Sequence, residues 1–218
     1  MKDNNHGDWI VIVNPNAGKG KGEKDWRRIA GLLDQYGIFH IPVFTVSQGH
    51  AIQLARDSIL QGYRKVIVVG GDGTLNEVVN GIFTQHACTT TDINLAMITV
   101  GTGNDWGKMY GIPQDYERAV RIIHEQNIRL QDTGLIEYHA GSRQVSRYFL
   151  NIAGLGFDAA VVRKTNHQKE KGRKGKALYF INLLSSLLQY NTTRVEMGID
   201  DNRFNGEVFS ISIGIGRY

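Results

Sequence analysis

The features of this sequence most suited to chemistry are aspartate and threonine side chains set among glycines. The run Gly70-Gly71-Asp72-Gly73-Thr74 places a carboxylate in a tight turn, directly after the apolar residues 66–69. Glycine lets backbone N–H groups approach phosphate oxygens closely, and a following helix N-terminus adds partial positive charge. A carboxylate at that point would repel phosphate unless a cation lay between them. The pattern therefore predicts a phosphate site with Mg²⁺ at Asp72.

Two more glycine-rich turns follow apolar runs. Residues 14–22 follow the run 9–13, and residues 101–105 follow the run 95–98. Because the carboxyl ends of parallel strands meet at one edge of a sheet, we expect the three turns to converge there. Neither the Walker A pattern nor the dinucleotide G-x-G-x-x-G pattern is present, since Gly107 comes one residue too late after Gly101 and Gly103.

The elements that must position these turns alternate between strand and helix in the first half of the chain. This order predicts an open, mostly parallel sheet with helices on both faces. The expected strands are residues 9–13, 39–46, 66–69 and 95–98, and the expected helices are residues 23–36, a helix capped by Ser47, and residues 75–83.

The second half of the chain is expected to be an antiparallel β domain. Its expected extended segments are 127–138, 145–152, 194–200 and 204–213, with helices at 116–124 and 177–190. We therefore divide the sequence into residues 1–130, a nucleotide-binding α/β domain, and residues 131–218, an incomplete antiparallel acceptor domain.

Composition excludes several classes of protein. Glycine contributes 26 of 218 residues but proline only 3, which argues against a disordered or collagen-like chain. The 25 basic and 21 acidic residues give a net charge of +4, too small to indicate a nucleic-acid partner. Cys88 is the only cysteine, so no disulfide framework is expected. A polar N-terminus without an apolar core predicts a cytoplasmic protein.

Four motifs in order resemble the diacylglycerol kinase catalytic-domain family, which includes sphingosine, ceramide and bacterial lipid kinases. They are Asn14-Pro15-x-Ala17-Gly18, the run from Gly70 to Gly81, Gly101-Thr102-Gly103-Asn104-Asp105 with Gly111-Ile112-Pro113, and Asn151-x-Ala153-Gly154-x-Gly156-Phe157-Asp158-Ala159. The resemblance extends from about residue 9 to the end of the chain.

The resemblance implies an ATP- and Mg²⁺-dependent kinase that phosphorylates the hydroxyl of a diacylglycerol-like lipid. It implies that Asp72 and Asp105 organise the phosphates, the metal and the water around them, with Asp72 as the Mg²⁺ ligand. The residues that it implies for nucleotide binding are Asn14, Pro15, Asn16, Ala17, Gly18, Thr45, Gly70, Gly71, Asp72, Gly73, Thr74, Leu75, Asn76, Glu77, Gly101, Thr102 and Asn104.

Family members carry their general base in a segment that has no counterpart here. We therefore expect the base beyond Tyr218, and a fragment with weak or no activity. Two alternatives stay open: an NAD kinase-like enzyme, which shares the Gly-Gly-Asp-Gly-Thr turn, and a nucleotide-binding regulatory module without catalysis. The basic residues 163–176 predict peripheral contact with an anionic membrane surface, and a homodimer is a further expectation.

Overall fold

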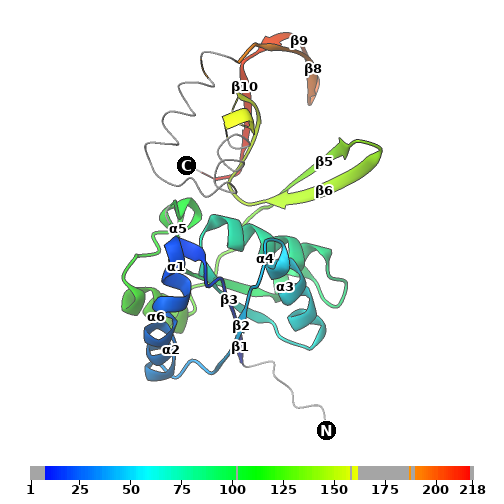
Figure 1. The fold of residues 1–218 in the computed structure, drawn as a ribbon. Helices are drawn as coiled ribbons and strands as arrows, with labels where there is room; N and C mark the ends of the chain where they lie inside the picture. Colours follow the sequence, from blue (N-terminus) through cyan, green and yellow to red (C-terminus); the bar gives the residue numbers. More distant parts are fainter. Residues whose placement is uncertain (1–7, 102, 158, 162–186, 188–189, 217–218) are drawn as a thin grey trace. The chain divides into compact units, whose positions relative to one another are not determined.

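Four short apolar runs form one parallel sheet. In a computed structural model, which describes residues 8–101, 103–157, 159–161, 187 and 190–216, the strand order is β2-β1-β3-β4 (Figure 1). Every neighbouring pair in this sheet is parallel. The strands are β1 (Trp9–Val13), β2 (His40–Phe44), β3 (Lys65–Gly70) and β4 (Asn94–Thr99). The predicted parallel sheet is thereby confirmed.

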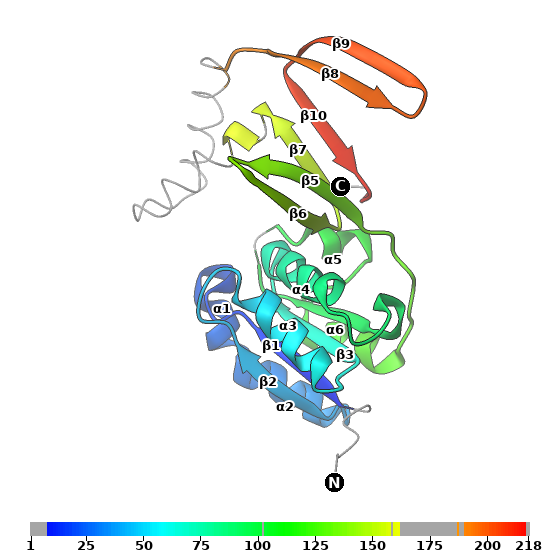
Figure 2. The same cartoon turned by 90° about the vertical axis from the view of Figure 1, so that its right-hand side faces the viewer.

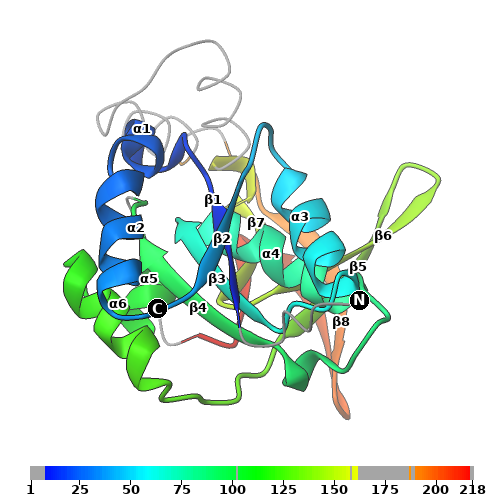
Figure 3. The ribbon, with the colours of Figure 1, turned by 90° about the horizontal axis from the view of Figure 1, so that it is seen from below.

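Helices cover both faces of the sheet because successive side chains of a strand point to opposite faces. Figure 3 shows α2 and α6 on one side of the sheet, and α3 and α4 on the other. Val11 and Ile67 pack toward the first pair, whereas Ile12 and Val68 pack toward the second. The helices are α1 (Ala17–Lys24), α2 (Trp26–Gln35), α3 (His50–Leu60), α4 (Asp72–Thr84), α5 (Asp105–Met109) and α6 (Tyr116–Glu125), with a short 3₁₀ turn at Thr90–Asp92.

Strand β2 forms one edge of the sheet and carries a proline at its centre. The Trp9 N–H donates to the Phe39 carbonyl, and the Thr45 N–H donates to the Val13 carbonyl. Odd-numbered residues of this segment therefore turn their backbone groups toward β1, and even-numbered residues turn theirs outward. Pro42 lies on the outward side, so its missing N–H removes a donor from the free edge.

The remaining strands pair as three antiparallel ribbons (Figure 2). Strand β5 (Gly134–Ala140) pairs with β6 (Arg143–Phe149), β7 (Ile152–Gly156) with β10 (Ser210–Gly214), and β8 (Thr193–Ile199) with β9 (Asn202–Val208). The antiparallel strands expected in the second half are thereby confirmed. In the described part of the chain, no helix combines the length and apolar character that crossing a membrane requires.

Contacts divide the chain into two units, Met1–Asn151 with Ile215–Tyr218, and Ile152–Gly214. The β5–β6 ribbon belongs to the first unit because α4 holds it by side-chain hydrogen bonds. The Asn80 Nδ2 donates to the Tyr148 carbonyl, and the Tyr148 N–H donates back to the Asn80 Oδ1, each at 3.0 Å. The boundary at residue 130 as a division of function stays a prediction.

Several element bounds differ from the sequence-based expectation. Residues 17–22 were expected in a loop but belong to α1 (Ala17–Lys24), which has positive φ angles at Gly18, Lys19 and Gly20. The helix α4 begins at Asp72, inside the expected turn, and β5 begins at Gly134 rather than at residue 127. Ser47 does not cap α3, whose N-cap is Gly49. The expected helix at 177–190 and the basic residues 163–176 lie almost wholly outside the described residues.

Tyr116 of α6 makes the folding stability of the first unit depend on pH in the alkaline range. Burial, together with the hydrogen bond that its hydroxyl donates to Asp25 at 2.7 Å, raises the pKa of Tyr116 from 10.0 to about 12. The folded state thus holds this proton more tightly than the unfolded state. The resulting stability is fully present below pH 10 and is lost as the pH rises toward 12.

We therefore expect Tyr116→Phe to lower the free energy of unfolding at pH 7 by about 1 kcal/mol. Between pH 10 and 12, wild-type stability should fall more steeply than that of the variant, because the variant lacks this titrating group. Urea unfolding at a series of pH values measures both effects. Parallel curves for the two proteins in this range would contradict the assignment.

Candidate functional site

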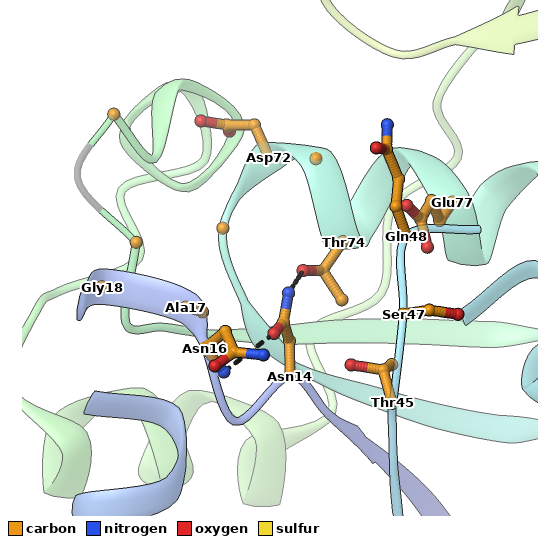
Figure 4. Close-up of a pocket in the computed structure, with 14 residues that line it drawn as sticks. Asn14, Asn16, Ala17, Gly18, Thr45, Ser47, Gln48, Asp72, Thr74 and Glu77 are labelled. Atoms are coloured by element: carbon orange, nitrogen blue, oxygen red, sulfur yellow. Dashed lines mark hydrogen bonds between the residues drawn. The ribbon is translucent and has the colours of Figure 1, made fainter. Parts of the chain in front are cut away.

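The loops that follow all four parallel strands line one pocket of about 480 Å³ (Figure 4). This is the carboxyl edge of the sheet, where open α/β folds place their ligands. The lining residues come from the loops after β1, β2, β3 and β4, from the start of α1 and from the first two turns of α4. They are Asn14, Asn16, Ala17, Gly18, Thr45, Ser47, Gln48, Gly71, Asp72, Gly73, Thr74, Glu77, Gly101 and Gly103.

Asn14 joins the first loop to the start of α4. Its Nδ2 donates to the Thr74 Oγ1 at 2.9 Å, and its Oδ1 accepts from the Asn16 N–H at 3.0 Å (Figure 4). The Thr74 oxygen thus accepts a hydrogen bond, which leaves its own hydroxyl hydrogen to donate elsewhere. The consequence is a fixed Thr74 side chain at the wall of the pocket.

The glycines of these loops are needed where two backbones meet. Gly18 has a φ of +60°, and a Cβ at this position would overlap the carbonyl oxygen of Val100. A Cβ on Gly101 would lie 2.7 Å from the Gly71 Cα, closer than any side-chain carbon can come. The loops after β1, β3 and β4 therefore approach one another through bare backbone, beside the pocket that all three line.

Asp72 joins the loop after β3 to the loop after β4. Its Oδ1 accepts from the Trp106 N–H at 3.1 Å, at the start of α5. Its Oδ2 lies 3.1 Å from the point where a Gly103 Cβ would stand, and the Asp105 Oδ2 lies 3.7 Å from that point. The two carboxylates predicted to organise metal and phosphate thus flank Gly103. Asp105 also forms an ion pair with Lys108, with the Lys108 Nζ 2.9 Å from the Asp105 Oδ1, and both side chains are about half exposed.

The Asp72 and Asp105 carboxylates suit Mg²⁺ better than they suit a metal ion that takes all its ligands from the protein. Within the described residues, no three His, Cys, Asp or Glu side chains gather around one point that could hold a metal. Mg²⁺ typically takes one or two carboxylates and completes its octahedron with water and substrate phosphates. Asp72, with one oxygen not bonded to Trp106, and the nearby Asp105 fit that donor set.

The structure brings most of the predicted site residues together. Eleven of them line the pocket, namely Asn14, Asn16, Ala17, Gly18, Thr45, Gly71, Asp72, Gly73, Thr74, Glu77 and Gly101. Pro15 and Gly70 adjoin these residues in the chain, and Asn104 and Asp105 follow Gly103, but none of the four lines the pocket. The Asn104 Nδ2 donates to the Gly101 carbonyl at 2.9 Å, while its buried Oδ1 has no partner among the described residues. Thr102 lies outside the described residues.

Two predicted residues point elsewhere. Leu75 is buried in the core beneath α4, and the Asn76 Nδ2 donates to the Tyr148 carbonyl at 3.0 Å. An α-helix advances about 100° per residue, so consecutive residues of α4 cannot all face one pocket. Their part in nucleotide binding stays a prediction, and the structure gives each of them a different partner.

The sequence-based list omitted Ser47, Gln48 and Gly103, which also line the pocket. Ser47 and Gln48 follow β2, so their position after a parallel strand was the available signal. Gly103 stood within a glycine turn already identified.

This architecture defines a class of protein: an α/β domain that receives its ligand at glycine turns beyond the carboxyl ends of parallel strands. Residues 8–136 match the family model described as the diacylglycerol kinase catalytic domain. The chain belongs to that family, as its four motifs predicted.

Similar proteins support this membership. A diacylglycerol kinase from Staphylococcus saprophyticus is 31% identical over 205 residues, which cover 94% of this chain and 63% of that protein. A diacylglycerol kinase from Bacillus subtilis is 30% identical over 199 residues, covering 91% and 61%. A crystal structure of a diacylglycerol kinase from Bacillus anthracis superposes with a TM-score of 0.70 at 27% identity, covering 97% and 65%. The chain thus spans less than two thirds of the length of these relatives.

Proposed function

We propose that this chain binds ATP with Mg²⁺ and supports transfer of the γ-phosphoryl group to the hydroxyl of a diacylglycerol-like lipid. The observation that carries the proposal is the glycine-lined pocket with Asp72 at its wall, in a chain of this family. Two of its relatives bear the name diacylglycerol kinase. That name supports a lipid acceptor.

The phosphates are proposed to lie at the first turn of the helix α4, facing the glycine loop at Gly18. The first N–H groups of a helix have no partner within the helix, and the helix dipole adds positive potential at that end. Gly71 and Gly73 leave this end of α4 open to a close approach, and the Thr74 hydroxyl can donate to a phosphate oxygen. Phosphoryl transfer relies mainly on positioning and on stabilising charge, which such a rigid cradle supplies.

Asp72 and Asp105 are the residues that would hold Mg²⁺. The ion, when bound, neutralises part of the charge on the phosphates. The role of the protein here is to fix the carboxylates: the Trp106 N–H holds one oxygen of Asp72, and Lys108 holds Asp105. These contacts orient both groups before any ligand arrives.

The test is an acceptor assay with the purified full-length protein, Mg²⁺ and ATP labelled on the γ-phosphate. Diacylglycerol in mixed micelles, a sphingoid base and NAD are offered in parallel. We expect a labelled phospholipid from diacylglycerol. Labelled NADP instead would favour the NAD kinase-like alternative, and tight ATP binding measured by calorimetry without any labelled product would favour the regulatory module. Membrane contact and homodimerisation stay proposals for separate measurement.

A further inference from the structure

Glu77 uses both of its carboxylate oxygens on the start of another helix. Its Oε1 accepts from the Gly49 N–H at 2.9 Å, and its Oε2 accepts from the Ala51 N–H at 3.3 Å. The helix α3 has glycine at its N-cap and no side-chain cap of its own. A carboxylate supplied by α4 thus satisfies backbone donors that the local sequence leaves open, and it lies where the dipole of α3 favours negative charge.

The loop between β2 and α3 is consequently held at both ends. At its start, the Thr45 N–H donates to the Val13 carbonyl, and the Val46 N–H donates to the His50 Nδ1 at 3.1 Å. At its end, Glu77 holds the Gly49 N–H. Ser47 and Gln48 lie between these anchors and line the pocket (Figure 4). This wall of the pocket therefore depends on hydrogen bonds at both ends of the loop, one of them made by Glu77, which itself lines the pocket.

The chemistry of this wall differs from that of the glycine loops. Thr45, Ser47 and Gln48 offer hydroxyl and amide groups, which can both donate and accept hydrogen bonds. Such groups match ribose hydroxyls and base nitrogens, whereas the bare backbone of the glycine loops matches phosphate oxygens. A free carboxylate beside phosphate would repel it, but the charge of Glu77 is already compensated by α3.

We propose that Glu77 is a positioning residue, which holds the Thr45–Gly49 wall in place to receive the ribose and base of the nucleotide. It is neither a phosphate ligand nor a metal ligand. The proposal rests on the proposed nucleotide-binding function, and it assigns specificity for the nucleoside part to a wall that a second helix fixes.

The test is Glu77→Gln, which keeps the shape of the side chain. A glutamine retains one acceptor oxygen, but its NH₂ group faces an N–H donor, so at least one of the two hydrogen bonds is lost. We expect amide hydrogen exchange at Gly49 and Ala51 to accelerate about tenfold without ligand, and the Kd for MgATP to rise about tenfold. The kcat at saturating ATP should stay near the wild-type value, because the wall binds the nucleoside and not the transferring group.

Glu117→Gln is the matched control: Glu117, in the first turn of α6, likewise accepts a hydrogen bond, from the Tyr36 hydroxyl at 3.3 Å, but does not line the pocket. It should leave the Gly49 and Ala51 exchange rates and the Kd unchanged. His50→Phe releases the other end of the loop and should weaken MgATP binding in the same direction, which keeps the test available if Glu77→Gln does not fold.

Faster exchange with weaker MgATP binding in Glu77→Gln supports the inference. Unchanged exchange overturns it, because Glu77 then does not hold the loop. Unchanged affinity also overturns it, because the wall then does not receive the nucleotide. If the wild-type protein binds no MgATP, the proposed function itself fails, and the exchange rates still show whether Glu77 holds the loop.

Discussion

Replacing Asp72 with asparagine is expected to lower kcat for the proposed phosphoryl transfer by about 10²-fold or more, with little change in stability. The asparagine Oδ1 can still accept the Trp106 N–H, so the link between α4 and α5 should survive. The negative charge is lost, and with it the group that fits Mg²⁺ at the pocket. The activity of this variant should therefore fall while its free energy of unfolding stays near the wild-type value.

Three measurements check this expectation: turnover with labelled ATP, the Mg²⁺ concentration needed for half-maximal rate, and urea unfolding. Asp34→Asn is a suitable control, because Asp34 is an exposed carboxylate near the end of α2 and does not line the pocket. Turnover within twofold of wild type for Asp72→Asn would remove Asp72 from the metal site. A large loss of stability would show that the charge serves the fold instead.

The second large effect is expected from Gly18→Ala, compared with Gly20→Ala. Both glycines have positive φ angles, +60° and +87°, so an alanine at either position pays about 1 kcal/mol for the left-handed backbone. Only Gly18 also faces another backbone, the Val100 carbonyl, whereas Gly20 has open space around its Cβ position. The difference between the two variants isolates the close approach of the loops.

We expect Gly18→Ala to lower the free energy of unfolding by about 1–3 kcal/mol more than Gly20→Ala does. MgATP binding should be lost or strongly weakened in Gly18→Ala alone, because the first loop must move away from the loop after β4. Urea unfolding and calorimetric titration of MgATP measure the two effects. Equal stabilities and equal affinities would mean that the loops are not held together at Gly18.

Much of this site could be predicted from the sequence because glycine reports backbone geometry directly. Gly18, Gly71 and Gly101 stand where main chains meet, and no other residue fits there without displacement. The apolar runs of the strands likewise predicted the parallel sheet, since a strand covered on both faces has no polar alternation. These features are local, so the printed sequence contains them.

The parts of the site that could not be predicted depend on contacts between residues far apart in the sequence. Leu75 and Asn76 follow Thr74 in the chain, yet the turn of α4 sends one into the core and the other to Tyr148. Ser47 joins the pocket through a loop whose conformation depends on Glu77, 28 residues beyond Gly49. The start of α3 was mispredicted for the same reason: a tertiary carboxylate replaced the expected serine cap.

The proline at the edge of the sheet has a consequence for how copies of this chain can associate. A second strand docked beside β2 would seek a donor at position 42 and find none, so one of its carbonyls would lose its partner. Self-association by continuing the sheet across that edge is therefore disfavoured, both as a route to a dimer and as a route to aggregation. Contacts between side chains are therefore the favoured route to a dimer on this side of the first unit.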